Sequence, residues 1–205
     1  EPAVASQPAT TPTKLPHHRL RGRAIYLAHA AKGDVVILRL RHRAVGPKRG
    51  DGMSVHAVSP TGKQFPEVTV PLDDEAEYTF TADATGTFAL HCDPDWHTVQ
   101  VASATHPLCI AGKEGQIHLL GTTGDFYFWV PGEAEQFGMR FQGAGDGERL
   151  SATVFDAKGA VRWQKADIGF PESFVAEREP TEQGEIWRIE ITRPSVGVLE
   201  DGHIV

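Results

Sequence analysis

The chain has 205 residues, of which 40% are hydrophobic, and its formal net charge is −7 at pH 7. That length and apolar content suffice for one large domain or two domains of ordinary size, each with its own core. The acidity and the absence of any base-reading motif argue against a nucleic-acid-binding protein. No apolar run approaches the 18 or so residues that a membrane span requires.

Residues 1–18 are rich in Pro, Ala and Thr and hold almost no large apolar side chain. Such a segment buries too little surface to offset its own ordering entropy, so we expect a linker or tail. The sequence has neither an initiator Met nor a signal-peptide pattern. We therefore expect a mature secreted form or a piece of a longer protein, with neighbouring domains as its partners.

From residue 19 the pattern becomes that of short strands separated by turns. Gly-containing and Pro-containing turns recur at regular intervals, which favours an antiparallel β-sandwich over a fold with crossover helices. The strands predicted for the first half are 23–29, 34–43, 53–58, 67–70, 77–82, 86–92 and 98–103.

The second half follows a short polar link at 113–115. Its most distinctive stretch is the run 126–130, five consecutive apolar residues between Asp125 and Pro131. A short aromatic run bounded by chain breakers predicts a strand that is buried on both faces. No segment of the chain shows a helical period longer than two turns, so the predicted class is all-β. The other strands predicted here are 116–120, 136–142, 150–155, 160–165, 185–191 and 196–205.

The two halves resemble each other. Three landmarks recur in the same order about 100 residues apart: Tyr26 and Tyr127, residues 59–62 and 156–159, and residues 86–88 and 184–186. An internal repeat of this length indicates tandem domains. We therefore predict a linker at 1–18 followed by two β-sandwich domains at 19–112 and 115–205.

The order of these landmarks resembles that of the bacterial pre-peptidase C-terminal (PPC-like) domains. The first half departs from the family pattern at Ser59, where the turn should carry Asp. The resemblance implies two tandem jelly-roll β-sandwiches that form an accessory module of a secreted or periplasmic protein, without catalytic residues, and it allows calcium or polysaccharide as a ligand. The segments that carry it are Ile25-Tyr-Leu27, Lys32-Gly-Asp-Val-Val-Ile-Leu38, His56-Ala-Val-Ser-Pro-Thr-Gly62, Gly86-Thr-Phe-Ala-Leu90, Phe126-Tyr-Phe-Trp-Val130, Ala152-Thr-Val-Phe-Asp-Ala-Lys-Gly159 and Gly184-Glu-Ile-Trp-Arg-Ile189.

A stripe of arginines is the most prominent surface feature. Arg39, Arg41 and Arg43 share one face of a predicted strand whose other face carries Val36, Leu38 and Leu40. If the first two strands pair, Arg21 and Arg23 lie beside them. Guanidinium groups in such a row could bind a sulfated or uronic polysaccharide. They could also dock on the acidic second half or a neighbouring domain, or simply form a solvated face.

Two loops carry weaker candidate sites. Trp96 lies in a polar loop, where its ring could stack on a sugar or plug the end of the sandwich. The acidic turn Asp73, Asp74 and Glu75 could supply oxygen ligands to calcium, although it lacks the Asp ladder of a calcium loop and fits a solvated turn as well.

The two cysteines, Cys92 and Cys109, could form a disulfide or remain free thiols. Cys92 and His97, together with either Asp93 or Asp95, could instead bind a transition metal, although their spacing matches no known metal motif. The leading hypothesis is a non-catalytic accessory module that contributes carbohydrate attachment or inter-domain packing. The alternatives are a dedicated carbohydrate-binding module for anionic glycans and a small metal-dependent hydrolase centred on His91, Cys92 and His97.

Overall fold

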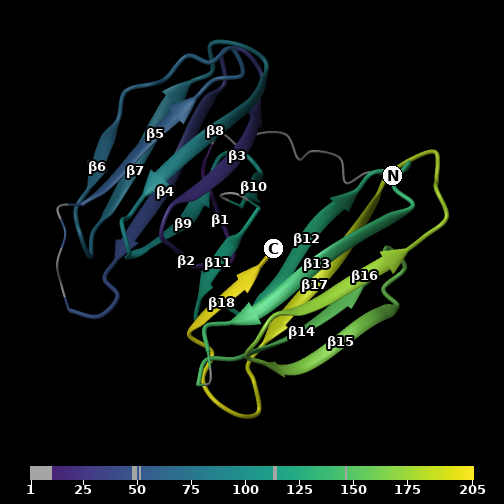
Figure 1. Cartoon of the computed structure of the whole chain (residues 1–205). Coiled ribbons are helices and arrows are strands. Elements are labelled where there is room, and N and C mark those ends of the chain that lie inside the picture. The colour runs from purple at the N-terminus through teal and green to yellow at the C-terminus, as the bar shows by residue number, and fades with distance from the viewer. Residues whose placement is uncertain (1–10, 48–49, 51, 113–114, 146) are drawn as a thin grey trace. The chain divides into compact units, whose positions relative to one another are not determined.

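The computed structural model describes residues 11–47, 50, 52–112, 115–145 and 147–205. The first ten residues of the predicted linker lie outside the described residues. In the described part of the chain every regular element is a strand and none is a helix (Figure 1), which confirms the all-β class. No helix there has the length and apolarity needed to cross a membrane. The chain divides into a first compact unit within Ala5–Ile117 and a second within His118–Val205.

The first unit is built from two groups of antiparallel strands. One group has the order β10 (Leu108–Ala111), β3 (Ala24–Ala30), β8 (Gly86–Asp93), β5 (Met53–Val58) and β6 (Val68–Val70). The other has the order β2 (Leu20–Arg21), β9 (Thr98–Ala104), β4 (Val35–Arg43) and β7 (Glu75–Thr81), and β1 (Thr13–Lys14) also pairs with β9.

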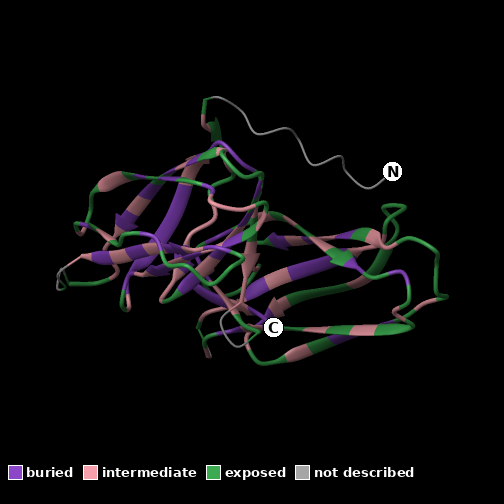
Figure 2. Cartoon of the chain, turned by 90° about the horizontal axis from the view of Figure 1, so that it is seen from above, coloured by how far each residue is buried: buried purple, intermediate pink, exposed green. Residues whose placement is uncertain are grey.

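The two groups face each other across an aromatic core. Phe80 on β7 and Phe88 on β8 are buried, and their ring centroids lie 5.2 Å apart. The Tyr78 hydroxyl, also on β7, accepts a hydrogen bond of 2.9 Å from the backbone N–H of Ala57 on β5. Buried residues alternate with intermediate or exposed ones along β4 and β5, and buried and less buried stretches alternate across the fold in Figure 2, as expected when one face of each sheet lines the core.

The second unit also has two groups of strands. The first has the order β12 (Gly124–Val130), β17 (Glu185–Thr192), β14 (Leu150–Phe155) and β15 (Val161–Ile168). The second has the order β16 (Glu172–Glu177), β13 (Gln136–Gly143), β18 (Asp201–Ile204) and β11 (Ile117–Leu120). Rings from both groups meet in the core: Phe137 on β13 packs edge-on against Trp187 on β17 at 4.9 Å, and Phe141 stacks on Trp163 of β15 at 5.2 Å.

Strand order is the same in corresponding parts of the two units. The order β3, β8, β5, β6 matches β12, β17, β14, β15, and the order β9, β4, β7 matches β18, β13, β16. Only the first unit has a strand, β10, on the far side of the opening strand β3; the corresponding edge of β12 has no strand beside it among the described residues.

The turn that follows β5 and the turn that follows β14 have the same hydrogen bonds. The side-chain oxygen of Ser59 accepts from the backbone N–H groups two and four residues later, and Asp156 Oδ1 does the same. Gly62 and Gly159 close these turns with φ of 85° and 80°, where glycine is favoured. A serine oxygen therefore replaces the carboxylate that the family pattern led us to expect at position 59.

Most predicted strands lie where the sequence placed them, but four were missed. Thr13–Lys14 (β1) lies within the segment predicted to be a linker, and Leu20–Arg21 (β2) precedes the first predicted strand; both pair with β9. Leu108–Ala111 (β10) and Glu172–Glu177 (β16) also had no strand assignment. Both are short and follow a proline, Pro107 and Pro171. Each forms an edge strand, where only one side of the backbone is paired and the sequence pattern is weakest.

Candidate functional site

An exposed row of aromatic side chains runs along β12, an edge strand of the second unit. Tyr127 and Trp129 are 67% and 52% exposed, whereas Phe128 turns inward and lies 5.7 Å from the Phe137 ring. The prediction that the run 126–130 is buried on both faces is therefore wrong. One face of β12 lines the core and the other faces solvent.

The Trp129 indole packs against the backbone of Gly184, the residue just before β17. A Cβ atom built on Gly184 would overlap Cζ2 and Cε2 of the Trp129 indole. The ring therefore occupies the place where a side chain of residue 184 would otherwise stand. Glycine at 184 leaves room for the indole to pack there, while half of the side chain remains exposed.

Neighbouring strands extend this surface. Tyr127 lies opposite Arg188 of β17, and Trp129 lies opposite Ile186, which is 37% exposed. The Arg188 guanidinium lies 3.8 Å from the centroid of the Phe155 ring on β14. We call the surface formed by these five side chains the aromatic face.

The aromatic face also carries fixed polar groups. Arg188 Nη1 donates to Asp125 Oδ1 at 2.6 Å, an ion pair between β17 and β12. The guanidinium is thus held from one side by a carboxylate and from below by the Phe155 ring. Flat rings beside a fixed donor and acceptor suit a ligand that presents both C–H faces and hydroxyl groups, and their support by a sheet keeps them in place.

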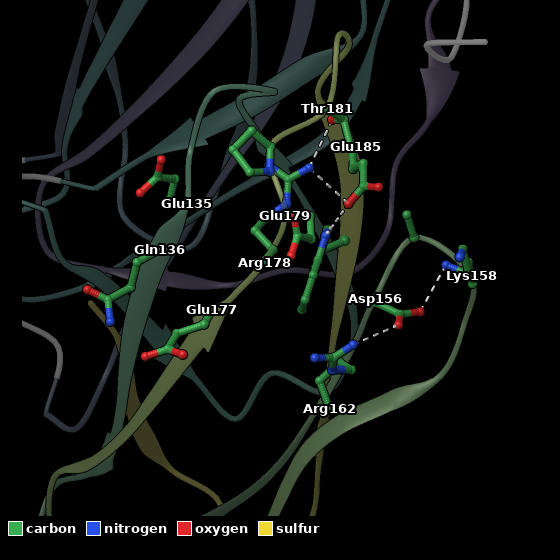
Figure 3. Close-up of a pocket in the computed structure, with 13 residues that line it drawn as sticks. Glu135, Gln136, Asp156, Lys158, Arg162, Glu177, Arg178, Glu179, Thr181 and Glu185 are labelled. Carbon is green, nitrogen blue, oxygen red and sulfur yellow. Dashed lines mark hydrogen bonds and ion pairs between the residues drawn. The ribbon is translucent and has the colours of Figure 1, made fainter.

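A polar groove of about 1030 Å³ lies elsewhere in the second unit (Figure 3). Arg178 anchors its wall: the side chain is only 7% exposed, and Nη1 donates to the carbonyl oxygens of Pro131 and Ala134 at 2.8 and 3.1 Å. Nη2 lies 3.4 Å from Glu185. Arg178 therefore ties the loop after β12 to the start of β17, which is a structural role.

The rest of the groove is charged rather than aromatic. Arg162 pairs with Asp156 at 3.5 Å and lies 5.9 Å from the Trp187 ring, which is itself only 3% exposed. Glu135 and Glu177 are exposed on the opposite wall. The groove offers hydrogen-bonding groups but no open ring on which a ligand could stack, so the aromatic face is the stronger candidate.

The predicted arginine stripe exists on β4 of the first unit. Arg39 and Arg41 donate through Nε to the two carboxylate oxygens of Glu75 at 2.9 and 2.8 Å, and Arg43 lies 3.6 Å from the same carboxylate. The assumption that the first two long strands pair is wrong, because β3 and β4 lie in opposite groups of strands.

Of the two arginines expected beside the stripe, Arg21 shares a row of the sheet with it and Arg23 does not. Arg21 on β2 lies opposite Thr98, which in turn lies opposite Arg43, so Arg21 and Arg43 share one row of the sheet. Arg23 lies outside that row and forms an exposed ion pair with Asp93 at 2.6 Å.

The acidic turn does not gather its carboxylates around one point. Asp73 Oδ1 accepts from the backbone N–H of Ala44, Asp74 Oδ1 accepts from the N–H of Glu75, and Glu75 faces the arginines. Across the described residues, no group of three or more metal-ligating side chains is arranged to hold an ion.

Trp96 is half-buried in the loop between β8 and β9. Its ring lies 4.2 Å from the His97 ring and against the backbone of Gly46, and its carbonyl oxygen accepts from Arg21 Nε at 3.2 Å. These contacts fit the loop plug that the sequence analysis considered as an alternative to a sugar-stacking ring.

The cysteines are not joined. Cys92 is buried on β8 and Cys109 is exposed on β10. β3 separates the two strands, with Ala24 opposite Cys92 and Leu27 opposite Cys109. Two strand spacings span roughly 9.5 Å, which exceeds the Cα separation of a disulfide. Of the two alternatives, the structure therefore has free thiols.

The hydrolase hypothesis requires His91, Cys92 and His97 to converge, and the structure does not bring them together. Burial raises the pKa of the Cys92 thiol to about 12, which keeps it protonated. His91 lies on the outer face of β8 and stacks on His56. His97 is buried in the next loop, where Nδ1 accepts from the N–H of Val45.

No family model matches the chain, and no curated protein matches it. Among solved structures, the structure of infectious bursal disease virus Gx strain matches with 11% identity and a TM-score of 0.18, over 98% of this chain and 73% of the viral chain. A score that low carries no argument about fold or function.

The aromatic face is what the sequence analysis missed. Tyr127 and Trp129 were assigned to the core because their neighbours are also apolar. The signal was present, since Asp125, Tyr127 and Trp129 alternate with Phe126 and Phe128 and the set that begins with a charged residue faces out.

Proposed function

We propose that this chain is a non-catalytic accessory module of a larger secreted bacterial protein, and that the aromatic face attaches that protein to polysaccharide. In this proposal the two units are tandem jelly-roll β-sandwiches of the PPC-like kind. Their common strand order and their matched turns at Ser59 and Asp156 support the repeat.

One observation carries the carbohydrate assignment. Trp129 is seated on Gly184 yet half exposed, and it lies in the same sheet face as Tyr127 and the Arg188–Asp125 pair. A solvent-exposed indole held in place loses little entropy on binding, so the cost of ordering a stacking platform has already been met in the free protein.

The test is binding of the purified chain to a panel of neutral polysaccharides, insoluble ones by sedimentation and soluble ones by affinity electrophoresis. We expect Trp129→Ala and Tyr127→Ala each to weaken binding about tenfold, the effect of losing roughly 1.4 kcal/mol of ring contact. Phe170→Ala is the matched control, because Phe170 is 64% exposed but lies off the aromatic face.

Two results would contradict the proposal. The first is that the wild-type chain binds no polysaccharide of the panel. The second is that the Trp129 and Tyr127 variants bind as well as Phe170→Ala. Circular dichroism of each variant checks that the fold is retained.

A further inference from the structure

A second surface, on β4 and its neighbours in the first unit, carries a concentration of positive charge. Arg39, Arg41 and Arg43 occupy alternate positions of β4 and point to the side away from the core. Glu75 on β7 is the carboxylate that they share. We call this surface the basic face.

Glu75 fixes the orientation of two guanidinium groups. Its carboxylate is engaged by Nε of Arg39 and Nε of Arg41. Burial raises the pKa of Glu75, but hydrogen bonds and charge from Arg41 and then Arg39 outweigh it, so the pKa lies below its usual value and the carboxylate stays ionised. Among the described residues, the terminal nitrogens of Arg39 and Arg41 make no hydrogen bond or ion pair, so each presents its end-on pair of N–H donors to solvent.

Two further cations lie in the same rows of the sheet. Lys14 on β1 lies opposite Ser103, which lies opposite Arg39. Arg21 on β2 lies opposite Thr98, which lies opposite Arg43. Five cationic side chains thus share a surface with two carboxylates, Glu75 and Glu77, the latter opposite Arg39.

We infer that the basic face binds the oxyanion groups of an anionic polysaccharide, either sulfate esters or uronate carboxylates. A guanidinium whose Nε is already engaged still offers two parallel N–H donors, which match the two oxygens of such a group. Arg39 and Arg41 are two residues apart on a strand, so the two donor pairs repeat at roughly 7 Å.

The charge of the whole chain favours a polymer of low charge density. A net charge of −7 repels a dense polyanion such as double-stranded DNA, which carries one charge per roughly 1.7 Å, while the local cluster attracts a polymer with about one charge per sugar. The inference takes from the proposed function only that the partner is a polysaccharide. It concerns another surface on another unit.

The experiment measures binding of the full chain to a sulfated polymer (dextran sulfate with about one sulfate per sugar), a uronate polymer (alginate), a neutral polymer (dextran) and double-stranded DNA, each at several salt concentrations. We expect Arg39→Gln/Arg41→Gln to weaken binding to dextran sulfate or alginate at least tenfold and to flatten its salt dependence. The dextran sulfate and alginate arms distinguish sulfate from carboxylate as the recognised group.

The matched control is Arg23→Gln/Lys63→Gln, which removes the same charge from the same unit at two other exposed ion pairs. We expect it to change binding less than threefold. A second variant, Arg39→Lys/Arg41→Lys, keeps the charge but removes the paired donors, and we expect it to lose most of the affinity. Denaturation curves check that each variant folds.

Four outcomes would overturn the inference: no binding of either anionic polymer, an equal loss in the Arg23 and Lys63 control, full affinity in the lysine variant, or tighter binding of DNA. Failure here is distinct from failure of the proposed function. The aromatic face is tested on neutral polymers with Trp129→Ala and Tyr127→Ala, which leave the basic face intact.

Discussion

Replacing Gly184 by alanine tests whether the Trp129 indole is held by the backbone beneath it. The new Cβ would overlap the ring, so the indole must leave its seat. Trp129 is 52% exposed, so about half of the roughly 200 Å² of a tryptophan side chain, about 100 Å², is buried there. At about 25 cal/mol per Å², complete displacement costs up to about 2.5 kcal/mol of unfolding free energy, and partial repacking leaves an expected loss of about 1–2 kcal/mol.

The assay is a double-mutant cycle in urea with Trp129→Ala as the second change. Once the indole is gone, Gly184→Ala has nothing to displace, and the reduced freedom of the unfolded chain makes it neutral or stabilising by up to about 1 kcal/mol. If Gly184→Ala lowers the unfolding free energy equally with and without the indole, the packing of Trp129 against Gly184 is refuted, because the strain would then lie in the backbone. Loss of polysaccharide binding in Gly184→Ala alone is expected to accompany the stability change.

Three further predictions follow from the described contacts. Cys109 should react with a thiol reagent in the folded protein and Cys92 only after denaturation, as a thiol count with and without denaturant would show; two slow thiols in the native state would contradict this. Burial, and then the charge of His118, lower the pKa of His203 to about 4. Because the unfolded residue takes up its proton near pH 6.5, the unfolding free energy should fall as the pH is lowered from about 6.5 to about 4. His203→Gln should flatten that part of the stability curve in pH-dependent urea denaturation. Asp156→Ala should cost about 1–2 kcal/mol in urea denaturation while Asp156→Ser, which keeps a turn-closing oxygen as at Ser59, should recover much of that loss.

Local chemistry in the sequence was enough to predict most of the strands and the turns after β5 and β14. Met53–Val58 and Leu150–Phe155 have the predicted bounds, because each ends at a turn whose Ser or Asp closes on the backbone and whose Gly adopts positive φ. These signals act over four or five residues. They can therefore be recognised from the sequence without knowledge of the rest of the fold.

Which face of a strand is covered could not be predicted in the same way. Alternation shows which residues share a face, but it does not show whether another strand or sheet lies over that face. The same limit explains why the sequence could not decide whether β3 pairs with β4 or whether Cys92 is bridged to Cys109. Both depended on which strands become neighbours, a property set by residues far apart in the chain.

The comparison of β3 with β12 shows where the two units differ. Ala28 lies opposite Phe88 and Phe128 lies opposite Trp187, and these inward positions pack the core in both units. The edges differ: β3 is flanked by β10, whereas β12 has no strand on its far side among the residues that the structure describes. The outward positions differ as well, since Tyr127 and Trp129 are exposed on β12. A common interior requires only that volume and pattern be kept, whereas binding depends on the particular side chains that face solvent. The two units can therefore have the same strand order in corresponding parts and still present an aromatic face in one and a basic face in the other.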